Sequence, residues 1–486
     1  MMATTHPLDD DKLHEECGVF GIFGNDDAAA HAALGLHALQ HRGQAAAGIV
    51  TFDGNQFHSH RGLGHVSDNF GSEETIKRLP GYAAIGHNRY ATTGATVVRN
   101  IQPLFADFAF GSLAVAHNGN LTNALRIRRD LVASGSLFQS TTDTEAIIHL
   151  IARSRESNVV SRFIDAMRQV EGAYSLVALT QKKLIGIRDP FGVRPLVLGR
   201  LGDAVILASE TCALDIIGAE FERDIEPGEM VVIDSDGMRS LRPFLPVPPR
   251  PCIFEHIYFA RPDSVVGGIS VYDARKRIGA ELARESHVPA DAIIPVPDSG
   301  VPSAMGYDEV AGVPFELGII RNHYVGRTFI EPTDNIRHLG VKLKHNANRA
   351  RIQGKRVVLV DDSIVRGTTS LKIVEMVRQA GAAEVHMRIS SPPTVHSCFY
   401  GIDTPERSKL LAAQHDTAEM ARIIGADSLA FISIDGLYRA MGEERGRNPQ
   451  RPSYCDACFT GEYPIRLADR DGGEQSRQLS LISEFA

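Results

Sequence analysis

The stretch Val357-Val358-Leu359-Val360-Asp361-Asp362-Ser363-Ile364-Val365-Arg366-Gly367-Thr368-Thr369 decides how the second half of this 486-residue chain folds. Its four aliphatic residues predict a buried parallel strand. The two carboxylates that follow would then lie at the carboxyl edge of the sheet, where ligands bind. Apolar residues recur at helical spacing from Leu371 to Val377, and Gly381 ends the pattern. The stretch therefore predicts a strand, an acidic pair, a phosphate-sized loop and a helix.

Two interpretations of this stretch are open from its residues. The backbone N–H groups of Val365 to Thr369 can cradle a phosphate at the helix N-terminus, while Asp361 and Asp362 can hold ribose hydroxyls or a Mg²⁺ shell. Alternatively, a buried strand ends in a solvated, helix-capping Asp-Asp-Ser. The complete run resembles the phosphoribosyl-pyrophosphate (PRPP) motif of type I phosphoribosyltransferases. That resemblance implies PRPP binding by Asp361, Asp362, Ser363, Ile364, Val365, Arg366, Gly367, Thr368 and Thr369.

The composition is that of an ordinary globular protein, with 43% hydrophobic and 23% charged residues, and the length predicts roughly two to four domains. The net charge of −8 and the lack of a long basic block argue against nucleic acid or an anionic membrane as a partner. No stretch approaches the roughly 18 apolar residues of a membrane span. Because the acidic N-terminus resembles neither a transit peptide nor a secretory signal, we expect a cytoplasmic protein.

A second decisive stretch begins where the polar residues 1–16 give way to Cys17-Gly18-Val19-Phe20-Gly21-Ile22-Phe23-Gly24, which predicts a strand starting at a cysteine. In one interpretation Cys17 is a small buried hydrophobic residue. In the other, residues 1–16 are removed, and the new α-amino group, with a pKa of about 7.7 to 8.0, accepts the proton of its own thiol. This stretch alone leaves both open.

Further motifs follow Cys17 in a fixed order, and together they resemble the glutamine amidotransferase domain of the N-terminal-nucleophile hydrolase superfamily. The resemblance covers roughly residues 17–240. It implies an α+β fold built as an αββα sandwich, with Cys17 as nucleophile. It also implies an oxyanion hole made by the Asn118 side chain and the Gly119 N–H, which we expect on an Asn-Gly turn. The other motifs are Leu39-Gln40-His41-Arg42-Gly43-Gln44, residues 86–94, Thr141-Thr142-Asp143-Thr144-Glu145 and residues 188–196.

The same resemblance implies how free glutamine is recognised. Arg89 would bind the α-carboxylate and Asp143 the α-ammonium, with Asn118 and Gly119 completing the site. The alternatives are a surface ion pair for Arg89 and a helix N-cap for Asp143. Wide, irregular spacing favours structural histidines over a metal site for His41, His87 and His117.

Five prolines within residues 243–251 predict a stiff connector, which is the best domain boundary in the chain. Beyond it, short apolar strands alternate with helical stretches, as in an α/β doubly wound parallel sheet. We therefore expect a propeptide at 1–16, a glutamine amidotransferase domain at 17–242, a linker at 243–251, a phosphoribosyltransferase domain at 252–465 and a tail at 466–486. The polar residues beyond about 466 are expected to fray.

Residues 293–300 repeat the pattern of a strand followed by a polar loop and resemble the pyrophosphate loop of the phosphoribosyltransferases. That resemblance implies PRPP binding by Asp298, Ser299 and Gly300, with Ser299 near a Mg²⁺ ion that Asp361 and Asp362 also serve. An ordinary Pro-Asp-Ser-Gly turn is the alternative. Residues 324–344 resemble the flexible loop that closes over PRPP, and a solvated basic loop is the alternative; its cations are Arg327, Arg337, Lys342 and Lys344.

Six cysteines are too few for a disulfide framework in a chain of this length. Cys455-Asp456-Ala457-Cys458 is a C-x₂-C pair that indicates metal, but thiolate chemistry does not separate zinc from iron and sulfur. Resemblance to one branch of the family implies a [4Fe-4S] cluster on Cys252, Cys398, Cys455 and Cys458. That branch also has a cleaved propeptide. We expect the remaining Cys212 to be a small buried residue.

Taken together, the two halves resemble the glutamine phosphoribosylpyrophosphate amidotransferase family over residues 17 to about 465. The resemblance implies that ammonia released from glutamine travels internally and displaces pyrophosphate from PRPP, giving 5-phosphoribosylamine in the first committed step of de novo purine synthesis. It further implies Mg²⁺, a homotetramer, and feedback inhibition by purine nucleotides such as AMP and GMP. Two alternatives are another glutamine-dependent synthase, which would lack the Asp361-Asp362 loop, and a PRPP-sensing regulator, which would lack the cysteine domain.

Overall fold

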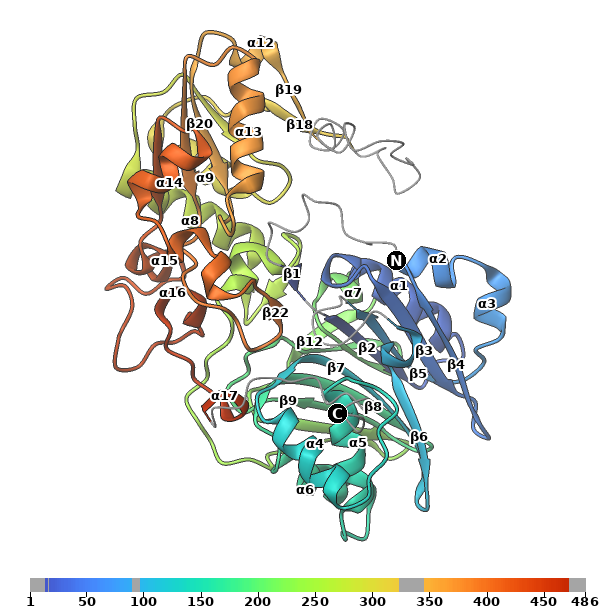
Figure 1. Cartoon of the computed structure of the whole chain (residues 1–486). Helices are drawn as coiled ribbons and strands as arrows, with labels where there is room; N and C mark the ends of the chain where they lie inside the picture. The colour runs from blue at the N-terminus through green and yellow to red at the C-terminus, as the bar shows by residue number, and fades with distance from the viewer. Residues whose placement is uncertain (1–13, 16, 90–96, 323–344, 472–486) are drawn as a thin grey trace, which may run out of the picture. The chain divides into compact units, whose positions relative to one another are not determined.

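The computed structural model describes residues 14, 15, 17–89, 97–322 and 345–471, which form two compact units (Figure 1). Among the described residues, the sandwich unit consists of those within Glu15–Cys252, Phe399–Asp403 and Tyr463–Asp471, and the parallel-sheet unit consists mainly of those within Ile253–Cys398 and Thr404–Glu462. Most of the predicted propeptide, the predicted loop at 324–344 and the end of the tail lie outside the described residues. No helix among the described residues is long and apolar enough to cross a membrane.

Two antiparallel sheets form the sandwich unit. The first has the strand order β12-β10-β11-β2-β5-β3-β4 and the second β14-β13-β9-β8-β7-β6. The strands of the first are β2 (Cys17–Phe23), β3 (Ala46–Phe52), β4 (Phe57–Leu63), β5 (Ala83–Arg89), β10 (Val197–Leu201), β11 (Ala204–Ala208) and β12 (Glu220–Asp224). Those of the second are β6 (Leu104–Phe108), β7 (Gly111–Leu121), β8 (Gly172–Thr180), β9 (Leu184–Arg188), β13 (Met230–Asp234) and β14 (Gly237–Leu241).

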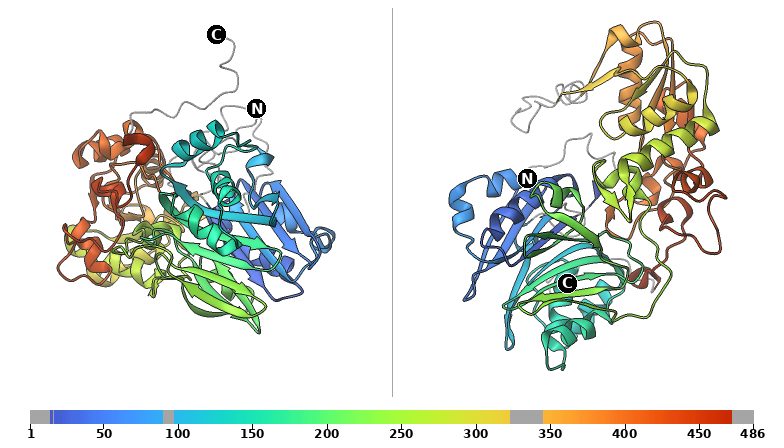
Figure 2. Two further views of the ribbon diagram at one scale, coloured as in Figure 1. Left: turned by 90° about the horizontal axis from the view of Figure 1, so that it is seen from below. Right: turned by 180° about the vertical axis from the view of Figure 1, so that it is seen from behind.

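Alternation along the strands gives each sheet two buried faces. In β2, Val19 faces the second sheet and packs in one core with Val177, whereas Phe20 packs with Leu36 on the outer, helical side. Helices cover both outer faces, so the unit has the predicted αββα layers (Figure 2). On the first sheet lie α1 (Ala28–Ala38), α2 (Val66–Phe70), α3 (Glu73–Lys77) and α7 (Cys212–Asp215), and on the second α4 (Ala124–Ala133), α5 (Thr144–Arg153) and α6 (Val159–Met167).

The parallel-sheet unit has a four-stranded sheet in the order β17-β20-β21-β23. The stretch Val357–Val360 lies in the buried strand β20, and the helical pattern after Gly367 is α13, so both predictions are confirmed. The strands are β17 (Ala292–Pro295), β20 (Arg356–Asp361), β21 (Glu384–Ile389) and β23 (Ser428–Phe431). The helices around them are α8 (Val271–Ser286), α9 (Val301–Ala311), α13 (Thr368–Gln379), α14 (Thr417–Ile424) and α15 (Ile434–Ala440).

This sheet reverses its winding between β17 and β20. After β17, the chain first reaches Phe315, which forms a parallel bridge with Ile293 on one edge of that strand. It later forms β20, which pairs in parallel with the other edge of β17. The core on one face joins Ile294 and Leu359 to α13 and α14, whereas α9, which packs on α8, also contacts β17 and β20. The fold is therefore doubly wound, and its switch point places the carboxyl ends of β17 and β20 side by side.

Short elements complete the two units. They are β1 (His14–Glu15), β15 (Val265–Val266), β16 (Ile269–Ser270), β18 (Ile319–Arg321), β19 (His345–Ala347), β22 (Ile402–Asp403), α12 (Arg349–Ile352), α16 (Ala457–Thr460), α17 (Ala468–Asp471), the π-helix Glu255–Phe259 and the 3₁₀ turns Gln40–Arg42, Val98–Asn100, Arg407–Lys409 and Leu411–Ala413. Because α17 is helical and packs against α4, the expected fraying beyond 466 is wrong for residues up to 471.

Candidate active sites

Cys17 opens strand β2 and lies at the end of a three-strand ladder. It is opposite Arg89, the last residue of β5, and Arg89 is in turn opposite Ala46 of β3. The Cys17 side chain is only 8% exposed. Gly43 passes this end of the ladder so closely that a Cβ there would lie 2.7 Å from the carbonyl carbon of Arg89. A glycine is therefore required for the chain to turn beside the cysteine.

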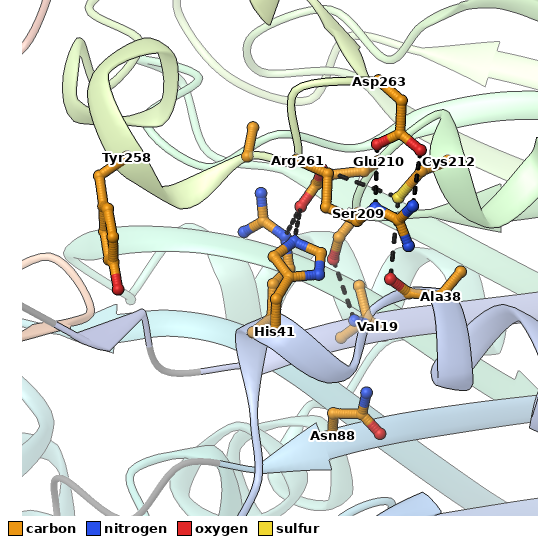
Figure 3. Close-up of polar contacts among 12 residues, drawn as sticks. Val19, Ala38, His41, Asn88, Ser209, Glu210, Cys212, Tyr258, Arg261 and Asp263 are labelled. Carbon is orange, nitrogen blue, oxygen red and sulfur yellow. Dashed lines mark hydrogen bonds and ion pairs between the residues drawn. The ribbon is translucent and has the colours of Figure 1, made fainter. Parts of the chain in front are cut away.

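A buried carboxylate anchors the neighbourhood of β2 (Figure 3). The Ser209 hydroxyl accepts a hydrogen bond from the N–H of Val19, and the next residue, Glu210, pairs with Arg42 and lies 2.6 Å from Nε2 of His41. Both Arg42 and Glu210 are fully buried. This network ties the predicted His41-Arg42 motif to the strand that begins at Cys17.

Cys212 lies beside the same carboxylate. It is 3% exposed, and its sulfur is 3.8 Å from Oε2 of Glu210, so the expectation of a small buried residue is confirmed (Figure 3). The signal for this anchor in the sequence is Ser209-Glu210-Thr211-Cys212, in which an acidic residue lies two positions before a buried cysteine.

Arg89 is buried and not part of a surface ion pair. Its side chain is 5% exposed, and Nη1 donates to the carbonyl of Asn100 at 2.8 Å. The Asn100 side chain then accepts from the N–H of Thr141 at 3.0 Å and donates to the Thr141 hydroxyl at 2.9 Å. Asn100 thus connects Arg89 to the segment that carries Asp143, a role that sequence reasoning missed because neither neighbour is near it in the chain.

Two buried histidines join the sheets just before the candidate residues. Nε2 of His87 in β5 donates to the carbonyl of His117 in β7 at 3.1 Å. Arg89 and Asn118 come one or two residues after these histidines, so this hydrogen bond links the two strands just before the candidate residues. Burial, followed by the nearby Arg89 charge, lowers the pKa of His87 to about 3, which keeps its ring neutral. Gln102, also missed from the sequence, accepts from the His117 N–H at 2.8 Å and donates to the Thr144 hydroxyl at 3.2 Å.

Asn118 carries an unpaired amide in the interior of the sandwich unit. The side chain is fully buried, and neither Nδ2 nor Oδ1 has a hydrogen-bond partner among the residues that the structure describes. Buried polar groups are almost always paired, because an unpaired one costs about 1–3 kcal/mol. A ligand that accepts from Nδ2 would remove that cost.

The expected Asn-Gly turn is wrong, because Asn118 and Gly119 lie inside β7, opposite Ser175 and Tyr174 of β8. The pairing with β8 continues through both residues and overrides the local turn preference. Gly119 has a φ of +139°, and a Cβ at this position would lie 2.0 Å from the carbonyl oxygen of Ala173. Glycine is therefore obligatory beside Asn118.

Asp143 caps helix α5, as the structural alternative for this residue proposed. Its carboxylate accepts from the N–H of Thr144 at 2.8 Å and from the N–H of Leu121, at the end of β7, at 3.0 Å. Burial opposes ionisation, but His117 and these two N–H groups outweigh it and lower the pKa of Asp143 below its usual value. The carboxylate is thus an anion held at the end of the strand that carries Asn118.

In the other unit, the acidic pair lies at the switch point of the sheet. Asp361 ends β20, and both Asp361 and Asp362 are buried. Oδ1 of Asp361 accepts from the N–H of Asp362 at 2.9 Å. Gly367 adopts a φ of +83° immediately before α13, so the loop from Asp362 enters the helix through a left-handed residue. This geometry directs the first N–H groups of a 12-residue helix toward the loop.

The second predicted loop meets the first. The Ser299 hydroxyl donates to Oδ2 of Asp362 at 2.5 Å, and a Cβ on Gly300 would lie 2.4 Å from the carbonyl oxygen of Val360. Asp298 pairs with Arg321. The two loops predicted to bind PRPP are therefore in contact at one sheet edge, with hydroxyl and carboxylate oxygens together. Arg327, Arg337, Lys342 and Lys344 lie outside the described residues.

Backbone hydrogen bonds connect the segments that carry the candidate cluster cysteines. The N–H of Ile253, which follows Cys252, donates to the carbonyl of Cys455, and the N–H of His396 donates to that of Cys458. Cys252, Cys455 and Cys458 are buried and Cys398 is partly exposed. Across the described part of the chain, no three His, Cys, Asp or Glu side chains are arranged to hold a metal ion.

Comparison with known proteins identifies a known domain family in each of the two units. A glutamine amidotransferase domain model matches residues 87–215, and a phosphoribosyl transferase domain model matches residues 270–390. The amidophosphoribosyltransferase of Rhizobium etli is 60% identical over 99% of this chain and 98% of its own length. That of Bacillus subtilis is 48% identical over 94% and 95%. The chain belongs to the amidophosphoribosyltransferase family.

Solved structures support the same conclusion across both units. An allosteric regulatory enzyme of purine biosynthesis superposes with a TM-score of 0.89 at 48% identity, covering 93% of this chain and 97% of that one. The glutamine PRPP amidotransferase of B. subtilis, complexed with ADP and GMP, gives 0.88 at 47% identity, covering 93% and 98%. The enzyme is therefore a pentosyltransferase that converts PRPP, glutamine and water to 5-phosphoribosylamine, glutamate and pyrophosphate in purine biosynthesis.

Proposed function

We propose that the glutamine half-reaction takes place at Cys17 after removal of residues 1–16. The observation that carries this proposal is the buried Asn118 amide, whose two polar atoms have no partner among the described residues. A donor held ready in this way is what a developing oxyanion requires. Cys17 begins a strand, so cleavage before it would expose an α-amino group next to the thiol without breaking the ladder of β2.

In the proposed sequence, the Cys17 thiol gives its proton to the α-amino group and its sulfur attacks the side-chain carbonyl of glutamine. The oxyanion accepts from Nδ2 of Asn118 and the N–H of Gly119. As the tetrahedral intermediate collapses, the C–N bond breaks and the proton returns to the departing ammonia. Water then hydrolyses the thioester to glutamate. Arg89 and Asp143 hold the α-carboxylate and the α-ammonium throughout.

The ammonia acceptor would be PRPP, bound at the β17–β20 switch point. The N–H groups at the start of α13 would hold the 5-phosphate, and Asp361 and Asp362 would bind the ribose hydroxyls and stabilise positive charge on the ring as pyrophosphate leaves. Contact between Ser299 and Asp362 supports the assignment, because it joins the pyrophosphate loop, residues 298–300, to the acidic pair.

Mg²⁺ fits this site by its donor chemistry. Ser299, Asp361 and Asp362 offer hard oxygen ligands, and an ion carried in by the pyrophosphate needs only one or two of them. When bound, it would neutralise the leaving pyrophosphate. Asp362 contacts both loops, because one of its carboxylate oxygens accepts a hydrogen bond from Ser299 and the other accepts one from Ser363.

The iron-sulfur and propeptide branch of the family is a separate proposal. The donor set of Cys252, Cys398, Cys455 and Cys458 suits a [4Fe-4S] cluster chemically, but the described side chains form no metal-binding group, and no step is assigned to the cluster. Anaerobically purified protein should contain about four irons per chain. Stoichiometric zinc without iron would contradict this assignment.

We also propose that the enzyme is a cytoplasmic homotetramer inhibited by purine nucleotides. Support for the inhibition comes from the B. subtilis structure, which is complexed with ADP and GMP. The inhibition is tested by measuring how inhibition by AMP and GMP depends on the PRPP concentration. The homotetramer is tested by measuring the mass of the enzyme in solution.

The central experiment measures pyrophosphate release from PRPP with glutamine or with ammonium. Cys17→Ala should lose the first activity and keep the second. The intact mass of the active enzyme should correspond to a chain whose first residue is Cys17. An active chain that retains residues 1–16, or a Cys17→Ala variant that still uses glutamine, would overturn the proposal.

A further inference from the structure

A cavity of about 280 Å³ lies within the sandwich unit, beside the predicted glutamine residues but without Cys17, Arg89 or Asn118 in its lining. It is lined by residues from the end of β7, the start of α4, the segment before α5, Phe399 and the chain around α17. Its lining includes Thr122, Leu125, Asp143, Phe399, Leu467 and Arg470. Asp143 thus belongs both to this cavity and to the proposed glutamine site.

Thr122 is a polar residue in the lining of this cavity. The residue is 6% exposed, and its hydroxyl has no hydrogen-bond partner among the described residues. Its backbone is already committed, because the N–H donates to Glu171 at 2.8 Å and the carbonyl accepts from Asp469 at 3.0 Å. A buried hydroxyl in this position is expected to bind a water or a ligand.

The charges around the cavity favour a molecule that carries both signs. Asp143 supplies a carboxylate on one wall. Asp469 also lines the cavity, but its carboxylate already accepts from the N–H groups of Leu125 and Arg126 at 2.8 and 3.1 Å, where it caps α4. The guanidinium of Arg470 lies 4.2 Å from the centre of the Phe399 ring, which holds a cation at the cavity. An ammonium would be drawn toward Asp143 and a carboxylate toward Arg470.

The size of the cavity limits its occupant. Ligand pockets usually measure about 300–1,000 Å³, so this cavity of about 280 Å³ is small for a ligand site and suits a free amino acid. Building on the proposed glutamine site, we propose that it is a second amino-acid subsite, which takes up glutamate after its release from Cys17. The product keeps the α-ammonium near Asp143 while its new carboxylate gains Arg470 and the Thr122 hydroxyl as partners. The glutamine substrate has a neutral amide in place of that carboxylate.

The experiment compares inhibition by glutamate in three variants of the full enzyme. Thr122→Val removes the hydroxyl with almost no change of shape, and Arg470→Gln removes the cation. Loss of one such hydrogen bond corresponds to about a tenfold rise in the glutamate inhibition constant, with the glutamine KM changed by less than about twofold. Arg126→Gln is the matched control, because Arg126 is in α4 next to the lining residue Leu125, but pairs with Glu171 and does not line the cavity.

Thermal stability gives a second readout. Because the Thr122 hydroxyl is unpartnered in the free protein, Thr122→Val should melt no lower than wild type, while losing most of the stabilisation by added glutamate. Unchanged glutamate inhibition in both variants would overturn the subsite. A glutamine KM that rises in parallel would show instead that the cavity is part of the substrate site. Ammonia-dependent turnover should stay normal in all three variants; failure of the Cys17 proposal would appear separately, as unaffected glutamine use in Cys17→Ala.

Discussion

Replacing Asn118 by Leu should make the enzyme more stable and less active at the same time. In the free protein, the amide nitrogen and oxygen of this fully buried side chain lack partners among the described residues. An unpaired buried polar group costs about 1–3 kcal/mol, so a similarly sized apolar side chain should recover about that much. The expected rise in melting temperature is about 2–4 °C for each kcal/mol in a unit of this size.

Activity should move in the opposite direction. Loss of one oxyanion-hole donor lowers kcat by about 10²- to 10³-fold, equivalent to about 2.7–4 kcal/mol of transition-state stabilisation. The loss should be confined to the glutamine-dependent reaction, since ammonia supplied from solution bypasses Cys17. Pyrophosphate release with each nitrogen source, and thermal melts on the same preparations, measure both effects.

Gln102→Leu is the matched control for stability. Gln102 is equally buried, but its oxygen accepts from His117 and its nitrogen donates to Thr144, so the same kind of change should destabilise the protein by about 1–3 kcal/mol. The reasoning fails if Asn118→Leu destabilises as much as the control, because its amide would then be paired in the free protein. Retained glutamine-dependent turnover would refute the oxyanion role.

Three further changes probe other parts of the structure. Gly367→Ala, at a φ of +83° with Leu411 only 2.7 Å from the new Cβ, should raise the KM for PRPP, whereas Gly354→Ala, at +74° in open space, should cost only the backbone strain of about 1 kcal/mol and leave that KM unchanged. Glu210→Gln leaves the buried Arg42 without its ion partner and should lower the unfolding free energy by about 3–5 kcal/mol in denaturant titrations, with a normal value counting against the anchor. Burial opposes ionisation of Glu145, but bonds from His149 and backbone N–H groups outweigh it and lower its pKa from 4.5 to about 2, so the stabilisation is complete above pH 4.5 and is lost as the pH falls toward 2. Glu145→Gln should flatten the fall of melting temperature in that window, and an unchanged slope would show that Glu145 does not titrate in this way.

Local patterns were enough to predict the elements that carry the candidate sites. Val357–Val360 read as a buried strand because all four residues are aliphatic, and the helix after Gly367 followed from its spacing. The predicted Asn-Gly turn is wrong. Asn118 pairs with Ser175 of β8, a strand far away in the sequence but adjacent in the sheet, and this pairing outweighs the local preference of Asn-Gly for a turn. The sequence also did not predict that Asp469 of α17 caps helix α4, because nothing in the polar segment around Asp469 indicates which distant helix it will contact.

The sequence by itself determined the order of the elements, the family resemblance and the residue types available at Cys17, Asp361 and Asp362, because these depend on neighbours along the chain. Only the tertiary structure decided which distant side chains meet. The pairing of Glu210 with Arg42, of Asn100 with Arg89 and Thr141, and of Ser299 with Asp362 depends on strand register and on the winding of the sheet. Such contacts join residues that no local periodicity relates, so their energies act only once the chain has folded.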